Sequence, residues 1–165
     1  MKIDFRDLDL IVFDFDGVLT DNSVYVDQFG VESVKCSRSD GLAFDILRKI
    51  NIRTIILSTE TNPIVQQRAK KLKIEAINSQ TNKEGFLKKF CKDNLYSLDR
   101  VLYVGNDLND YYAMKSAGYR ICPSDSHPKI LEIATKVIDV KGGDGVVRHI
   151  VEDIFHLNVM DLMES

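Results

Sequence analysis

Two aspartates follow an apolar run in the segment LIVFDFDGVLTD, which covers residues 10–21. The run LIVF is typical of a buried strand, and burying an ionised carboxylate is costly unless a partner compensates for it. Asp14 and Asp16 must therefore leave the core where the strand gives way to a loop. In an open α/β sheet, ligands bind at this edge, outside the carboxyl ends of the strands. The two aspartates are thus candidates for a functional site.

Other polar side chains follow later apolar runs or begin a later helical segment. They are Ser58, Thr59, Glu60, Lys83, Asn106, Asp107 and Asp110. We expect these groups to converge, because the carboxyl ends of parallel strands meet at one edge of a sheet. Clustered carboxylates repel one another unless a cation joins them, and hard oxygen ligands of this kind suit Mg²⁺. The residues alone therefore favour a magnesium site with a lysine nearby.

The elements that would position these groups alternate between two kinds of segment. Strands are predicted over residues 10–15, 53–57, 74–77, 100–105, 119–122 and 136–140, and helices over 39–51, 62–73, 82–94, 109–118, 127–134 and 145–157. Such alternation predicts an α/β fold, with a doubly wound parallel sheet covered by helices on both faces. We expect Ser39 or Asp40 to cap the first helix, Pro63 to lie just inside the second, and Gly118 to follow the fourth.

One segment breaks this alternation. Residues 24–37, VYVDQFGVESVKCS, are typical of two short strands around a turn near residues 28–30. A β-hairpin is therefore predicted directly after the two aspartates.

Size and charge exclude several classes of protein. The 165 residues, 44% of them hydrophobic, predict one domain over residues 1–165. The net charge is −3 and the basic residues are scattered among acids, so we expect no nucleic-acid partner. No apolar stretch approaches a membrane span, and the start MKIDFRDLDL lacks the pattern of a secretory signal. Cys36, Cys91 and Cys122 have no metal or redox spacing, so a cytoplasmic protein with reduced thiols is expected.

Four motifs in order resemble the haloacid dehalogenase superfamily of phosphatases. They are DFDGVLTD at residues 14–21, Ser58 after an apolar strand, Lys83, and VGNDLND at residues 104–110. The segments SDGLAF, VQQRAKKLKI and GGDGVVRHIVEDI, with the early hairpin, are similar to a nearly capless subgroup. That subgroup dephosphorylates 3-deoxy sugar acids, namely 3-deoxy-octulosonate (KDO) 8-phosphate or nonulosonate 9-phosphates, in KDO or sialic acid biosynthesis. The resemblance implies a HAD-like Rossmannoid sheet with a hairpin in place of a cap domain.

The resemblance also implies roles for the motif residues. Asp14 would be the nucleophile that forms an aspartyl phosphate, and Asp16 would protonate the leaving alkoxide and then activate water. Side chains at i and i+2 of an extended segment share a face, so both can reach one phosphoryl group. Ser58 and Lys83 would hold the phosphoryl oxygens and their charge, and Gly17 would allow close backbone approach.

The fourth motif departs from the family pattern at the expected magnesium ligand. The family usually has Asp at this position, whereas this chain has Asn106 followed by Asp107. An amide oxygen can coordinate Mg²⁺ but supplies no charge. We expect Mg²⁺ to be held by Asp14, Asp16 and Asn106, with Asp107 as the alternative to Asn106 and Asp110 behind the ligands.

Two acids bear on the choice of substrate. Glu60 and Asp144 stand where relatives that act on the eight-carbon acid tend to carry basic residues. The nine-carbon group has a Glu at the place of Glu60 and a Lys eleven residues later, here Lys71. The residues expected to contact the sugar acid are Gly17, Thr59, Glu60, Arg68, Lys71 and Arg148. The favoured substrate is therefore a nonulosonate 9-phosphate, such as that of KDN or an N-acylneuraminate, and KDO 8-phosphate is the alternative.

The family is typically homotetrameric, with hairpins joining the subunits and a neighbour covering each site. Two other classes remain open. A phosphoacceptor receiver domain shares several of these groups, but its phosphorylated Asp ends a later strand, where this chain has Ser58. A non-catalytic tetramer-forming module that serves a sugar-acid cytidylyltransferase is favoured by Asn106. Taken singly, Asp14 and Asp16 could begin a turn, and Lys83 could be a surface lysine.

Overall fold

The computed structural model describes residues 3–164 and contains a six-stranded parallel sheet. Its strands, in spatial order, are β5 (Glu75–Ile77), β4 (Thr54–Leu57), β1 (Leu10–Phe13), β6 (Val101–Val104), β7 (Tyr119–Cys122) and β8 (Lys136–Val137). The predicted doubly wound α/β sheet is confirmed. Strand β1 lies in the middle, between β4 and β6, and all four of its residues are buried. Its carboxyl end is therefore flanked by the ends of two other strands.

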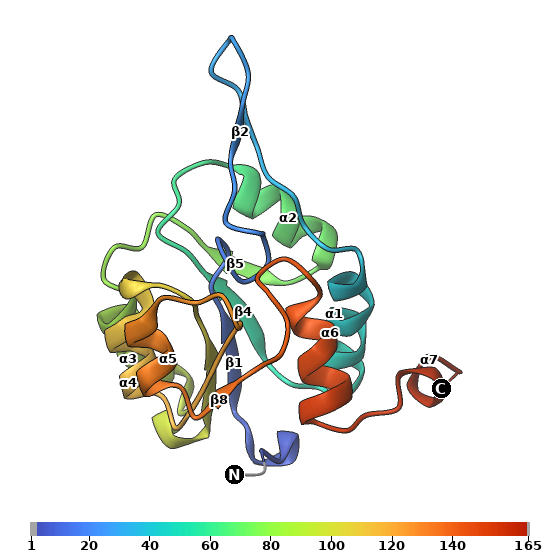
Figure 1. The fold of residues 1–165 in the computed structure, drawn as a ribbon. Helices are drawn as coiled ribbons and strands as arrows, with labels where there is room; N and C mark the ends of the chain where they lie inside the picture. The colour runs from blue at the N-terminus through green and yellow to red at the C-terminus, as the bar shows by residue number, and fades with distance from the viewer. Residues whose placement is uncertain (1–2, 165) are drawn as a thin grey trace.

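Helices cover both faces of the sheet (Figure 1). Helices α1 (Ser39–Lys49), α2 (Ile64–Leu72) and α6 (Val146–His149) pack on the face that carries Ile11 and Phe13. Helices α3 (Lys83–Asn94), α4 (Tyr111–Ser116) and α5 (Pro128–Ile133) pack on the face that carries Leu10 and Val12. Because side chains alternate along a strand, β1 contributes to two separate cores.

The predicted hairpin is present and projects from the body of the molecule (Figure 1). Strands β2 (Tyr25–Val26) and β3 (Glu32–Ser33) pair antiparallel. The Asp27 carboxylate closes the turn, because its Oδ1 accepts from the N–H groups of Phe29 and Val31 at 2.8 and 2.9 Å. The hairpin is small and replaces no helix or strand of the main sheet.

The caps of the helices differ from the sequence prediction. Arg38, and neither Ser39 nor Asp40, occupies the N-cap of α1, and it makes no side-chain cap bond. Asp40 lies on the buried side of the first turn, where its Oδ1 accepts from the N–H groups of Val147 and Arg148 at 2.9 and 3.3 Å. Asp40 therefore satisfies the start of α6, which Gly145 leaves without a side-chain cap. Pro63 is at the N-cap of α2 instead of inside the helix.

The chain after α6 also differs from the prediction. The expected single helix over residues 145–157 is α6 followed by a π-type turn at Ile150–Ile154, and a further helix α7 (Val159–Glu164) was not predicted. The short α7 packs against α1, where the Lys49 ammonium donates to the Leu162 carbonyl at 2.6 Å. Within residues 3–164, no helix combines the length and apolar character needed to cross a membrane. The three cysteines are unpaired, as predicted.

Candidate active site

Strand β1 delivers Asp14 to the edge of the sheet. The Asp14 N–H donates to the Val104 carbonyl at 2.9 Å, so the backbone continues the pairing with β6 for one residue beyond β1. The carboxylate is almost fully buried, and its Oδ1 accepts from the Phe15 N–H at 2.7 Å. Hydrogen bonds therefore fix both the backbone and the carboxylate of Asp14, and so limit rotation of its side chain.

Lys83 reaches Asp14 from the first residue of α3. The Asn82 side chain caps this helix by accepting from the Gly85 N–H at 2.9 Å, and so fixes where the helix begins. The Lys83 side chain is 1% exposed, and its Nζ lies 2.8 Å from Asp14 Oδ1 and 2.7 Å from Asp110 Oδ1. Lys83 is therefore not a solvated surface lysine, and the structure brings it to Asp14.

Asp110 binds four groups at once. Its Oδ1 accepts from Lys83 Nζ and from the Tyr103 hydroxyl at 3.0 Å. Its Oδ2 accepts from the backbone N–H groups of Asn106 and Asp107 at 3.0 and 3.4 Å. This fully buried carboxylate therefore ties β6, the loop after β6 and α3 together.

The electrostatics of this cluster favour a bound cation. Burial raises the pKa of Asp14 well above its ordinary value, and the nearby Asp110 raises it further, while Lys83 lowers it. Burial lowers the pKa of Lys83, but Asp14 and Asp110 together leave that pKa raised, so the ammonium stays charged. Two ionised carboxylates against one ammonium would leave an uncompensated negative charge in a buried site. A proton or a metal cation relieves this charge.

Asp16 and Gly17 lie where the chain turns away from β1. Asp16 is half-buried, and burial raises the pKa of its carboxyl, with a further contribution from Glu60. Gly17 has a φ of +79°, and a Cβ at this position would lie 1.9 Å from Asn106 Nδ2. Only glycine therefore lets the loop after β1 pack against Asn106.

The loop after β4 carries three of the predicted residues. Ser58 is buried, and its Oγ accepts from the Glu60 N–H at 3.0 Å. Thr59 Oγ1 accepts from Asn109 Nδ2 at 3.3 Å, which joins this loop to the loop after β6. Glu60 Oε1 accepts from the N–H groups of Thr61 and Asn62 at 2.6 and 2.7 Å. These bonds direct one Glu60 oxygen to its own loop.

Asn106 and Asp107 have different surroundings. Asn106 is buried, and its Oδ1 has no hydrogen-bond partner among the described residues. Asp107 is exposed, and its Oδ1 accepts from the Leu108 N–H at 2.7 Å to cap the turn Leu108–Asp110. An unpartnered buried amide oxygen beside Gly17, in the loop after the two aspartates, fits a hard cation. Residues 3–164 contain no group of three His, Cys, Asp or Glu side chains that could hold a metal ion.

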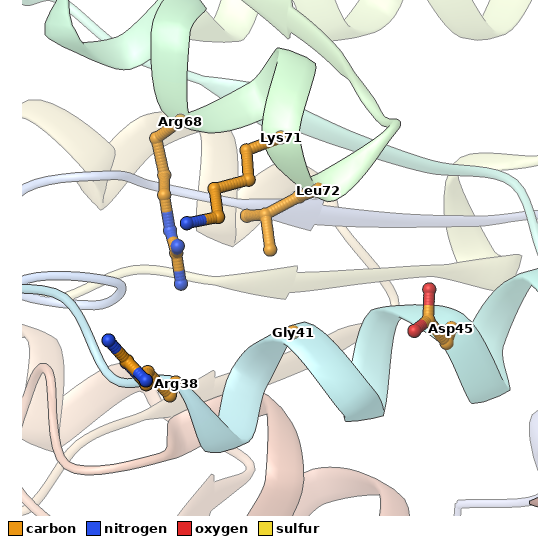
Figure 2. Close-up of a pocket in the computed structure, with 6 residues that line it drawn as sticks. All are labelled: Arg38, Gly41, Asp45, Arg68, Lys71 and Leu72. Carbon is orange, nitrogen blue, oxygen red and sulfur yellow. The ribbon is translucent and has the colours of Figure 1, made fainter.

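A cavity of about 370 Å³ lies between α1 and α2. Arg38, Arg68 and Lys71 point into the space between the two helices (Figure 2). Arg68 is fixed by donating from Nη2 to the Ser37 carbonyl at 2.7 Å. Burial raises the pKa of the neighbouring Cys36 thiol, while Arg68 lowers it and Asp16 raises it further. Because Cys36 also pairs with Thr20, this cationic cavity lies near the loop that follows β1.

One predicted substrate-binding residue lies away from this cavity, and two residues of the cavity and the buried cluster were not predicted. Arg148 does not line this cavity; its Nη1 donates to Glu152 at 2.7 Å, and it lines another cavity with Leu42 and residues near α7. Arg38 and Tyr103 were missed. Tyr103 could have been found as the only polar side chain in the apolar run VLYV, immediately before the fourth motif.

The fold and this cluster define a class of protein. A doubly wound sheet whose central strand ends in Asp14, beside a buried lysine that also contacts Asp110, is typical of an α/β phosphatase with a carboxylate nucleophile. Comparison with known proteins agrees with this class. A family model described as haloacid dehalogenase-like hydrolase matches residues 45–150.

Individual relatives are consistent with that match. The 3-deoxy-D-manno-octulosonate 8-phosphate phosphatase KdsC of Salmonella typhi is 28% identical over 144 residues, which cover 87% of this chain and 77% of the relative. A HAD family hydrolase from Streptomyces avermitilis MA-4680 has a TM-score of 0.92 and 38% identity, covering 96% of this chain and 91% of the other. The 3-deoxy-D-manno-octulosonate 8-phosphate phosphatase from Moraxella catarrhalis, in complex with magnesium ion, phosphate ion and KDO, has a TM-score of 0.87 and 27% identity, covering 92% and 88%.

The chain belongs to the haloacid dehalogenase-like hydrolases. Within that family it is similar to 3-deoxy-D-manno-octulosonate 8-phosphate phosphatases. The expected family and enzyme class are confirmed, and the receiver-domain alternative is wrong.

Proposed function

We propose that this chain is a Mg²⁺-dependent phosphomonoesterase that removes the phosphate of a 3-deoxy sugar acid, with KDO 8-phosphate as its substrate. The buried cluster of Asp14, Lys83 and Asp110 carries the proposal, because it places a fixed carboxylate beside an ammonium at the mouth of the sheet. The names of the relatives support the eight-carbon substrate better than the nine-carbon substrate that the sequence favours.

In this proposal, Asp14 attacks phosphorus and forms an aspartyl phosphate, while Asp16 gives its proton to the leaving alkoxide. In the second step, Asp16 removes a proton from water as the water attacks phosphorus. The bond between phosphorus and the Asp14 carboxylate breaks, and phosphate leaves. The raised pKa of Asp16 suits a group that must be protonated in the first step. Lys83 compensates the charge on the phosphoryl group, and Ser58 with Thr59 bind its oxygens.

Mg²⁺ would be held by Asp14, the Asp16 carbonyl and the orphaned Asn106 Oδ1, and would screen the nucleophile from the phosphate dianion. Asp107 is the weaker candidate, because its Oδ1 already caps a turn. Asp110 is saturated by four donors and would stay behind the ligands.

The sugar-acid carboxylate would bind in the cationic cavity of Arg38, Arg68 and Lys71. Three cations and one acid, Asp45, line this cavity, and the excess of positive charge suits a carboxylate better than a neutral hydroxyl. The nine-carbon acids remain a second candidate because Lys71 lines this cavity and Glu60 stands at its predicted place in the loop after β4. The hydrogen bonds of Glu60 to its own loop weaken that candidate.

The test is phosphate release, with Mg²⁺ and with a chelator, from KDO 8-phosphate, KDN 9-phosphate, N-acetylneuraminate 9-phosphate and a simple hexose phosphate. We expect metal-dependent turnover with the highest kcat/KM for KDO 8-phosphate, and loss of turnover in Asp14→Asn without loss of the fold. A higher kcat/KM for a nine-carbon substrate would reverse the order of the two candidates. Absence of turnover on all four would instead support a non-catalytic module.

A further inference from the structure

Tyr103 is the one polar side chain of β6, and it lies on the side of the sheet that faces α3 and α4. Its side chain is completely buried. Burying a hydroxyl without a partner costs free energy, whereas a phenylalanine of the same shape carries no such cost. The hydroxyl meets this cost through a single described contact, the bond it donates to Asp110 Oδ1 at 3.0 Å.

The hydroxyl is the outer end of a chain of contacts that reaches the nucleophile. Tyr103 donates to Asp110 Oδ1, Lys83 Nζ donates to the same oxygen at 2.7 Å, and Nζ also lies 2.8 Å from Asp14 Oδ1. A carboxylate offers about four lone-pair positions. Tyr103, Lys83 and two backbone N–H groups occupy both oxygens of Asp110, so that the carboxylate is held in one orientation.

Lys83 is shared almost equally between two carboxylates, at 2.7 and 2.8 Å. An ammonium has three N–H donors, so two directed at carboxylates leave a third for the phosphoryl group. Tyr103 takes part of the charge of Asp110 Oδ1 through its own hydrogen bond. Without the hydroxyl, that oxygen attracts Lys83 more strongly, and the ammonium moves from Asp14 toward Asp110.

We propose that Tyr103 is a positioning residue for the reaction: its buried hydroxyl balances Lys83 between Asp110 and the nucleophile Asp14. The catalytic part of this proposal rests on the proposed function. Burial raises the pKa of Tyr103 well above its ordinary value, and Asp110 raises it further, so the hydroxyl remains a donor at every pH at which the fold would be assayed.

The kinetic test is Tyr103→Phe, which removes one oxygen and preserves the ring. We expect kcat to fall about tenfold, the loss typical of one hydrogen bond to a charged group, with KM within about twofold of wild type. Tyr119→Phe is the matched control, because Tyr119 on β7 packs against the opposite core. A kcat within twofold of wild type, or a change in KM alone, would overturn the proposal.

A second measurement does not depend on catalysis. In protein labelled with ¹⁵N-lysine, the buried and doubly bonded Lys83 ammonium should give a slowly exchanging signal, assigned through its loss in Lys83→Arg. Tyr103→Phe should shift or broaden this signal, and Tyr119→Phe should not. An unchanged signal in Tyr103→Phe contradicts the proposal even if the enzyme is active. A shifted signal in a protein without turnover supports the positioning role and rejects the proposed function alone.

Discussion

The single residue that most separates this chain from its family pattern is Asn106. Among the described residues its buried Oδ1 has no partner, while its backbone N–H donates to Asp110 Oδ2, so the backbone is fixed and the side-chain oxygen is free. Asn106→Asp adds a negative charge where a cation is expected and should tighten Mg²⁺ binding about tenfold. Calorimetric titration with Mg²⁺ measures this, and Asp107→Asn is the control that should change the affinity little. Unchanged Mg²⁺ affinity in Asn106→Asp, together with weaker binding in Asp107→Asn, would instead assign the ligand to Asp107.

Lys71 carries the second prediction at this scale. It lines the cationic cavity with Arg38 and Arg68, so Lys71→Ala should weaken binding of the sugar-acid carboxylate. We expect KM for KDO 8-phosphate to rise about tenfold, as for the loss of one charge-assisted bond, while kcat and the kinetics on a hexose phosphate stay unchanged. Lys70→Ala is the control, because this exposed neighbour lies outside the residues that line the cavity. A loss of similar size on the hexose phosphate would show a general effect on the fold.

Residues could be predicted from sequence where a strand end or motif order fixes their place. Asp14 and Lys83 were found in this way, and the structure brings them within hydrogen-bond distance. Arg38 and Tyr103 were missed because their relevance comes from contacts across helices and strands, which spacing does not reveal. Arg148 was placed with Arg68 on resemblance, yet the geometry of α6 directs it to Glu152.

At the scale of elements, the strand and helix order was predictable and the ends of the elements were not. Strands such as β1 and β4 are continuous runs of buried, mostly apolar residues, and such runs can be recognised in the sequence. The sequence predicts Ser39 or Asp40 as the N-cap of α1, because an acid or a serine at the start of a helix is typical of a cap. Here the start of α6 lies against α1 and takes the carboxylate, a contact between residues more than 100 positions apart.

This contact between α1 and α6 predicts how stability depends on pH. Burial raises the pKa of Asp40 to about 6, although the Arg148 and Val147 N–H groups lower it. Because the folded pKa exceeds the unfolded value of 3.8, Asp40 contributes stability that is complete below about pH 4 and is lost as pH rises through about 6. Asp40→Asn does not titrate. The free energy of unfolding of the variant minus that of wild type should therefore increase by roughly 2 kcal/mol from pH 4 to pH 7.

Urea unfolding at several pH values between 4 and 7.5 measures this difference. Asp45→Asn is the control, because Asp45 lies on the same helix but is exposed and paired with Arg48. A constant difference between Asp40→Asn and wild type across this range would show that Asp40 is ionised in the folded protein throughout.

At the scale of the whole molecule, the hairpin exposes apolar side chains that no other part of the described chain covers. Its side chains Val24, Tyr25, Val26, Phe29 and Val31 are between 52% and 82% exposed. Apolar side chains gathered on one projecting hairpin mark a surface for association. Because the hairpin follows the loop of Asp16 directly, subunits joined through it would lie near one another's active sites.

We therefore propose that hairpins join copies of this chain into a homotetramer. A charge introduced into the hairpin by substitution should prevent this assembly. Phe29→Asp places a carboxylate on the most exposed of these side chains, where burial against another copy would be unfavourable. Sedimentation velocity at micromolar concentration should show a tetramer for wild type and a monomer for Phe29→Asp. Leu95→Asp is the control, since Leu95 is 93% exposed at the end of α3, and should leave the tetramer intact. A monomeric wild type would contradict the proposal, and the exposed hairpin would then require a different partner.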